Sequence, residues 1–183
     1  PRANGFVGCT NLKSIDVMLV GSFVRDENGM AVEYANVTKD YLYSVNNESF
    51  AGMPNMKYLY LGHGAGGSVY TNAFVGSSIE KLVIKRLNNF GGAPIDTPFA
   101  GENALKEIWI GGEGPNGMRI QQTAFTKLTH DINIYFCNYT LEEVIAMTGS
   151  DKWYTDADEK AHFYFKDTMP ADVVWPERFN PAI

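Results

Sequence analysis

The stretch Phe50-Ala-Gly-Met-Pro-Asn-Met56-Lys-Tyr-Leu59-Tyr-Leu61 decides the fold of this chain, because its apolar residues follow a fixed spacing. Counted from Phe50, they stand at offsets of 6, 9 and 11. The last two are two residues apart, which is the period of a short β-strand with one buried face. Phe50 and Met56 precede this strand and are expected to fill the core from the opposite side. A single unit of this kind cannot bury its apolar face, so the stretch predicts a stack of similar units.

The same spacing recurs on both sides of this stretch. Two copies have identical offsets: Phe6 with Leu12, Ile15 and Val17, and Phe99 with Leu105, Ile108 and Ile110. In a third copy, Phe74 with Ile79, Leu82 and Ile84, each offset is one residue shorter. A fourth copy, Phe125 with Ile134 and Phe136, keeps only the offsets of 9 and 11. From Phe50 onward the phenylalanines are 24, 25 and 26 residues apart, within the roughly 20–29-residue period of leucine-rich repeats.

This repeat predicts a leucine-rich repeat solenoid. Its parallel sheet consists of short strands near residues 13–17, 57–61, 80–84, 106–110 and 132–136, stacked in chain order. The opposite side is expected to be irregular and rich in turns. The phenylalanines that begin the units are expected to be buried between the two sides: Phe6, Phe50, Phe74, Phe99 and Phe125.

The first interval is irregular, because 44 residues separate Phe6 from Phe50. Within it, residues 22–34 resemble two short strands around the turn Asp26-Glu-Asn-Gly29. Residues 18–48 are therefore either a degenerate repeat or a β-hairpin insertion near the N-terminus. The sequence alone leaves both interpretations open.

The pattern changes after the last repeat. Thr140-Leu-Glu-Glu143 is a capping-box sequence that predicts a short helix through about Met147. A turn and the strand-like residues 162–166 follow. A stacked array needs an atypical end to cover its last apolar face. We therefore expect a repeat array over residues 1–139 and an α+β C-terminal cap and tail over residues 140–183.

Residues at offsets 8 and 10 alternate with the buried strand positions and must point to the other face of the sheet. In successive copies they are Ser14 and Asp16, Tyr58 and Tyr60, Lys81 and Val83, Glu107 and Trp109, and Asn133 and Tyr135. Aromatic side chains with polar tips are enriched where proteins bind partners. Tyr58, Tyr60, Trp109 and Tyr135 are therefore the candidate binding residues. Alternatively, these rings only stabilise the sheet, or they are buried beneath residues 18–45.

The repeat Phe-x-Gly-[Cys/Met/Ser]-x-x-Leu-x-x-Ile-x-[Val/Ile/Leu] resembles the BspA-like leucine-rich repeats of bacterial surface proteins. The resemblance covers about residues 5–136, and Asp151-Lys-Trp-Tyr154 is similar to the way such arrays close. It implies a secreted or surface-anchored protein that adheres to other proteins or to host material and has no catalytic centre. We therefore expect a non-enzymatic binding or adhesion module for a protein or glycan. The alternative is a structural spacer domain of a longer surface protein.

Composition argues against several other classes of protein. The net charge is −6 and the 15 Lys and Arg residues are scattered, whereas a nucleic-acid-binding surface needs clustered basic residues. The apolar runs are too short to span a bilayer, so no membrane insertion is expected within this chain. No signal-peptide pattern is present. The expected extracellular or cell-surface location therefore rests on the resemblance alone.

One motif suggests a cofactor. Gly62-His-Gly-Ala-Gly-Gly67 matches the glycine spacing of a dinucleotide-binding loop. That loop must open a helix whose N-terminus faces the pyrophosphate, but residues 68–74 favour a strand. We interpret residues 62–67 as a turn between repeats, like the similar stretch at residues 111–117, and expect no cofactor.

No catalytic or metal-binding pattern emerges from the remaining residues. His63, His130 and His162 lack the spacing of a zinc site, and residues 156–159 lack the glycine and final glutamate of a calcium loop. Cys9 and Cys137 stand four strand intervals apart, on the order of 20 Å. We therefore predict two free thiols, no metal and no catalytic residue.

Overall fold

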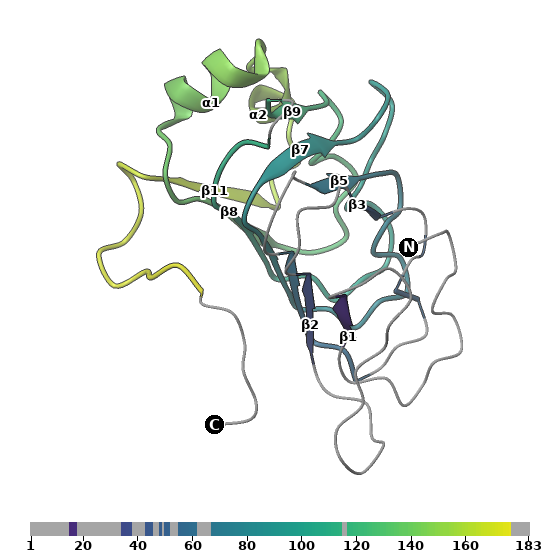
Figure 1. Cartoon of the computed structure of the whole chain (residues 1–183). Coiled ribbons are helices and arrows are strands. Elements are labelled where there is room, and N and C mark those ends of the chain that lie inside the picture. Colours follow the sequence, from purple (N-terminus) through teal and green to yellow (C-terminus); the bar gives the residue numbers. More distant parts are fainter. Residues whose placement is uncertain are drawn as a thin grey trace.

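The computed structural model describes residues 15–17, 34–37, 43–45, 48, 50–51, 55–61, 67–114 and 117–176. The framework of this part of the chain is a pair of sheets made of short strands (Figure 1). The larger sheet contains, in spatial order, β1 (Ile15–Val17), β2 (Tyr34–Val37), β4 (Tyr58–Leu61), β6 (Lys81–Ile84), β8 (Glu107–Ile110), β10 (Ile132–Phe136) and β11 (Ala161–Phe165). The smaller sheet contains β3 (Tyr43–Val45), β5 (Gly67–Val69), β7 (Leu87–Phe90) and β9 (Arg119–Ile120). Every pair of neighbouring strands is parallel.

The order of strands in the larger sheet confirms the predicted stacking in chain order. All five predicted strands form, and the register aligns equivalent repeat positions, for example Leu59 with Leu82 and Ile108 with Ile134. β2 lies between β1 and β4, so residues 34–37 contribute one further strand. This placement favours the degenerate repeat over a hairpin insertion. The hairpin predicted over residues 22–34 lies outside the described residues except for Tyr34, which begins β2.

The prediction of an irregular opposite side is wrong, because the smaller sheet lies there. Its strands are two to four residues long and lie beyond the repeated spacing of apolar residues, which ends with the strands of the larger sheet. Only β5 overlaps a stretch that favoured a strand, residues 68–74. Each strand follows a strand of the larger sheet, as β7 follows β6 and β9 follows β8. Apolar residues from all four strands reach the core: Val45, Val69, Leu87, Phe90 and Ile120.

The core lies between the two sheets and is organised around the repeated phenylalanines. Phe50, Phe74, Phe99 and Phe125 are all buried, as predicted, and Phe6 lies outside the described residues. Their rings form a continuous stack with centroid separations of 6.1, 5.9 and 5.6 Å. Such offset stacking contributes beyond the area that each ring buries.

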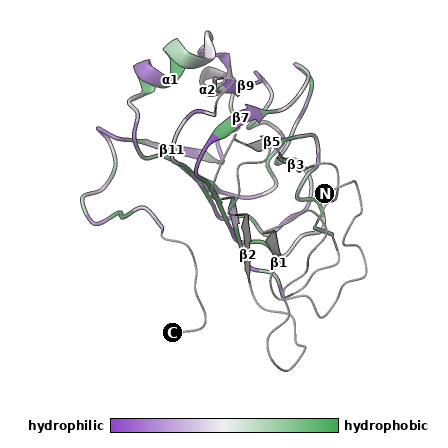
Figure 2. Cartoon of the chain, viewed as in Figure 1, coloured by the Kyte–Doolittle hydropathy of each residue, from purple (hydrophilic) through white to green (hydrophobic). Residues whose placement is uncertain are grey.

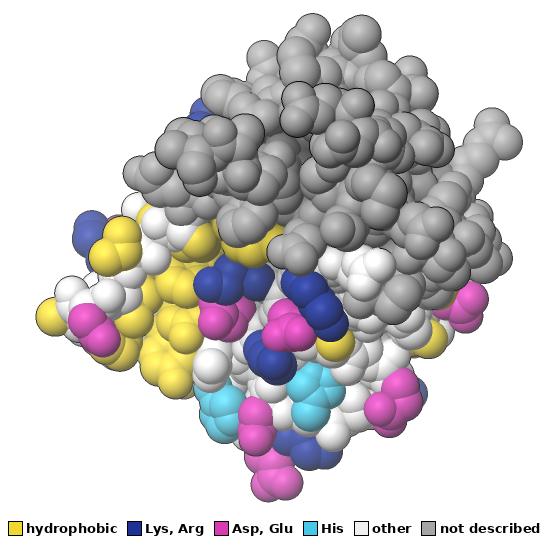
Figure 3. Space-filling model, turned by 90° about the horizontal axis from the view of Figure 1, so that it is seen from below, with side chains coloured by type: hydrophobic (Ala, Val, Ile, Leu, Met, Phe, Trp, Pro, Cys, Tyr) yellow, Lys and Arg dark blue, Asp and Glu magenta, His cyan; other side chains and the backbone are white. Residues whose placement is uncertain are grey.

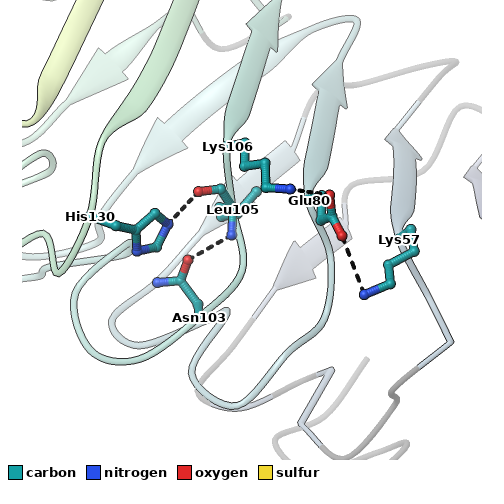
Figure 4. A network of polar contacts seen from close by, with 6 residues as sticks. All are labelled: Lys57, Glu80, Asn103, Leu105, Lys106 and His130. Atoms are coloured by element: carbon teal, nitrogen blue, oxygen red, sulfur yellow. Dashed lines mark hydrogen bonds and ion pairs between the residues drawn. The ribbon is translucent and has the colours of Figure 1, made fainter.

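Charged side chains at the start of the strands tie the repeats together across the surface (Figure 4). Glu80 accepts from Lys57 at 3.3 Å and from Lys106 at 2.6 Å. The Lys106 hydrogen bond is the main reason that the pKa of Glu80 is lowered. His130 bonds to the carbonyl of Leu105 in the same region. The two ion pairs join β4, β6 and β8, and the His130 bond adds β10. Exposed ion pairs of this kind contribute little stability individually.

The C-terminal cap covers the last repeat with helix α1 (Leu141–Thr148), helix α2 (Lys152–Thr155) and β11. The capping box at Thr140 and Glu143 is confirmed, because the side chain of each bonds to the backbone N–H of the other. Figure 2 shows hydrophobic and hydrophilic residues mixed along α1, and Val144 supplies its buried contact. Trp153 of α2 is fully buried against Phe125 and Phe136.

Candidate functional site

The outer face of the larger sheet, opposite the core, carries the candidate binding residues. The pairing of neighbouring strands aligns the outward-facing residues in two rows that run across the strands. The first row is Tyr58, Lys81, Glu107, Asn133 and His162, and the second is Tyr60, Val83, Trp109, Tyr135 and Tyr164. All four sequence-predicted residues therefore lie on this face, as their parity requires.

The second row is an aromatic stack at the cap end of the sheet. The rings of Trp109 and Tyr135 are 4.0 Å apart and nearly parallel, and those of Tyr135 and Tyr164 are 4.9 Å apart. These three residues stand at equivalent positions of β8, β10 and β11. The stack is a product of strand register, because each ring occupies the position directly opposite the next.

The two ends of the second row differ in exposure. Tyr60, Val83 and Trp109 are 8%, 0% and 6% exposed and form a second apolar cluster, separate from the main core. Tyr135 and Tyr164 are only partly buried. The outer face is therefore covered at Tyr60 and Trp109 and accessible at Tyr135 and Tyr164.

The chain's own C-terminal segment supplies part of this cover. Val173 and Trp175 pack against the cluster, and the indole of Trp175 meets that of Trp109 edge to face at 6.4 Å. Figure 1 shows this segment running along the side of the larger sheet that faces away from the smaller one. The sequence suggested residues 18–45 as a cover and gave no role to the tail.

The first row is polar and holds Trp109 in place. Lys81 and Glu107 form an ion pair at 2.9 Å, and Glu107 also accepts from the indole N–H of Trp109 at 2.8 Å. The ammonium of Lys81 lies 5.7 Å from the centre of the Trp109 ring, a cation–π distance. In Figure 3, basic and acidic side chains alternate beside a band of hydrophobic ones. Burial, together with Tyr60 and Glu107, raises the pKa of Tyr58.

Two residues of this face were missed by sequence reasoning. Tyr164 alternates with Phe163 and Phe165 in a predicted strand, so its outward direction was detectable from parity. Its alignment with Tyr135 was not, because the cap departs from the repeat. Trp175 lies in a proline-flanked segment without periodicity, and no sequence signal indicated its contact with Trp109.

Described residues of the remaining sequence motifs form contacts within the fold. Residues 62–66 lie outside it, and Gly67 begins strand β5, not a helix. His130 and His162 have different partners: His130 bonds to the carbonyl of Leu105, and His162 pairs with Asp131 at 3.1 Å. Asp156, in the acidic turn, bonds to Gln122.

Cys137 is a free thiol, as predicted, whereas Cys9 and His63 lie outside the described residues. Burial raises the pKa of Cys137 to about 11.

Among the described residues, no cluster of His, Cys, Asp and Glu side chains could hold a metal ion. Within the same part of the chain, no helix has the length and apolar character needed to cross a membrane.

Comparison with family models, curated proteins and solved structures gave no match for this chain.

Proposed function

We propose that the chain is a leucine-rich repeat solenoid of the BspA-like kind that serves as a non-enzymatic binding or adhesion module. It belongs to a secreted or surface-anchored protein and contacts a protein or glycan through the outer face of the larger sheet. The observation that carries this proposal is the stacked pair Tyr135 and Tyr164, which remains accessible where the rest of the aromatic row is covered. Partly exposed tyrosines on a rigid sheet are typical of recognition surfaces, because they offer a large contact area at a low cost in conformational entropy.

The test is a protein and glycan array probed with the wild type and with a Tyr135→Ala/Tyr164→Ala variant. Loss of the double ring should weaken binding by at least about tenfold, equivalent to about 1.4 kcal/mol. Tyr70→Ala is the matched control, since Tyr70 follows β5 of the other sheet and is also partly buried. A ligand that binds both variants as tightly as the wild type would refute the role of this face.

A second function is favoured by the covered half of the row. Tyr60, Val83 and Trp109 are almost fully buried, so these side chains stabilise the sheet and offer little surface to a ligand. This is what a structural spacer domain without a ligand would require. That alternative predicts that Trp109→Ala costs about 3–5 kcal/mol of stability. It also predicts that the array returns no ligand for the wild type.

A further inference from the structure

A cleft of about 680 Å³ lies where three successive strands of the larger sheet end. Lys85 and Arg86 follow β6, residues 111–114 follow β8, residues 137–139 follow β10, and Trp175 of the C-terminal segment closes one side. The register that pairs Ile84 with Ile110 and Phe136 continues into these loops. The volume falls within the roughly 300–1,000 Å³ range of small-molecule sites.

Glycine at position 111 makes room for the Trp175 side of the cleft. A Cβ at Gly111 would stand 2.8 Å from Trp175 Cη2 and 2.9 Å from the carbonyl oxygen of Lys85, closer than real Cβ atoms approach. Gly112 differs, because a Cβ there would meet Tyr139 Oη and the Lys85 carbonyl at an ordinary 3.6 Å. Position 112 can therefore accept a Cβ without a clash, and a larger side chain there would compete for space with a ligand between Lys85 and Tyr139.

The cleft is basic, although the chain as a whole carries a net charge of −6. Lys85 and Arg86 outnumber Glu113, the one acidic residue of the lining. Both cations are exposed, and neither forms an ion pair with a described residue, in contrast to Lys57, Lys81 and Lys106. Two neighbouring cations without a carboxylate partner favour an anionic ligand.

Three N–H groups of the glycine-rich loop are already hydrogen-bonded, and any run of three successive N–H groups within residues 111–114 includes one of them. The N–H groups of Gly111, Gly114 and Gly117 donate to the carbonyls of Ile84, Leu87 and Gly114 at 2.9, 2.9 and 3.0 Å. A phosphate held in a nest of backbone amides would need these donors. The anion must instead be bound by the side chains of Lys85 and Arg86, and a carboxylate fits the planar guanidinium fork.

Aromatic and polar groups complete the lining. The indole N–H groups of Trp109 and Trp153 bond to Glu107 and Thr148, whereas that of Trp175 has no acceptor among the described residues. Trp175 and Tyr139 line the same space as the two cations, and the Tyr139 hydroxyl lies beside Gly112. The Trp175 ring can stack on a sugar ring, Tyr139 can bond to a sugar hydroxyl, and Lys85 with Arg86 can bind a carboxylate. Together these groups match a sugar that carries a carboxylate.

We propose that this cleft binds a hexuronic acid unit of an acidic glycan. The carboxylate lies between Lys85 and Arg86, and the sugar ring lies against Trp175. The site is separate from the Tyr135 and Tyr164 surface and does not depend on the proposed function.

The experiment is a titration of the full chain with digalacturonic acid and with its neutral dimethyl ester, followed by the NMR signal of the Trp175 indole N–H. The acid should shift this signal saturably, and the ester should bind at least about tenfold more weakly because one charge-assisted contact is lost at each carboxylate. Lys85→Gln/Arg86→Gln should reduce binding of the acid by a similar factor. Arg119→Gln/Lys127→Gln, which removes the same charge from other exposed positions, should leave it unchanged.

Gly112→Leu tests the cleft independently of charge and should abolish binding while the far-UV circular dichroism remains that of the wild type. Tyr164→Ala, which removes a ring outside the cluster that contains Trp175, should leave digalacturonate binding intact, and this separates the inference from the proposed function. Equal affinity for acid and ester, or binding that survives both Lys85→Gln/Arg86→Gln and Gly112→Leu, would overturn the proposal.

Discussion

Removal of an inner ring of the phenylalanine stack should be among the most damaging single changes in the core. Phe99 is 1% exposed and contacts three other rings, with centroids 5.9 Å away at Phe74, 5.6 Å at Phe125 and 5.1 Å at Phe90. Phe99→Ala leaves a cavity that neighbouring repeats cannot fill, because each is fixed by its own strand pairing. Such truncations cost about 3–5 kcal/mol, and the lost ring contacts favour the upper half of that range.

Urea denaturation followed by circular dichroism measures this loss, and in a thermal scan about 4 kcal/mol corresponds to a fall of about 8–16 °C in Tm. Ile95→Ala is the control, because Ile95 is 83% exposed and should change stability by less than about 0.5 kcal/mol. Phe99→Leu should lie between the two. A loss below about 1 kcal/mol for Phe99→Ala, with an unchanged denaturant dependence, would refute the continuous stack as the basis of the fold.

Three smaller effects follow from individual contacts. Thr140→Ala removes the capping-box acceptor and should lower the free energy of unfolding by about 1 kcal/mol, whereas Thr140→Ser should restore most of it in the same urea titration. Alkylation of Cys137 by iodoacetamide should accelerate with pH up to about 11, where its raised pKa lies; a plateau near pH 9 would contradict its burial. Because the pKa of Glu80 is lowered in the folded state, its ion pairs stabilise the protein above the ordinary carboxyl pKa and lose that effect as the pH falls through the lowered value. Glu80→Gln should therefore cost at most about 1 kcal/mol at pH 7 and low salt, and the difference from wild type should vanish at low pH; an equal cost at both pH values would exclude an electrostatic origin.

The outer face of the larger sheet shows where inference from sequence was limited. Parity within each strand was enough to place Tyr58, Tyr60, Trp109 and Tyr135 on one face, because direction in a strand is a local property. Exposure is not local. Trp109 is covered by Val173 and Trp175, which lie more than sixty residues later in the sequence and carry no periodic signal that would bring them there.

The sequence by itself determined the order of the repeats, the buried phenylalanines and the capped helix at Thr140, since each of these follows from spacing within about a dozen residues. Tertiary structure alone decided three features: the smaller sheet, the alignment of Tyr164 with Tyr135, and the cleft that joins Lys85 and Arg86 to Trp175. The smaller sheet lies outside the repeated spacing of apolar residues, which ends with the strands of the larger sheet. The alignment of Tyr164 depends on how the cap strand packs against the last repeat. The cleft depends on how the loops after three strands pack against the C-terminal segment.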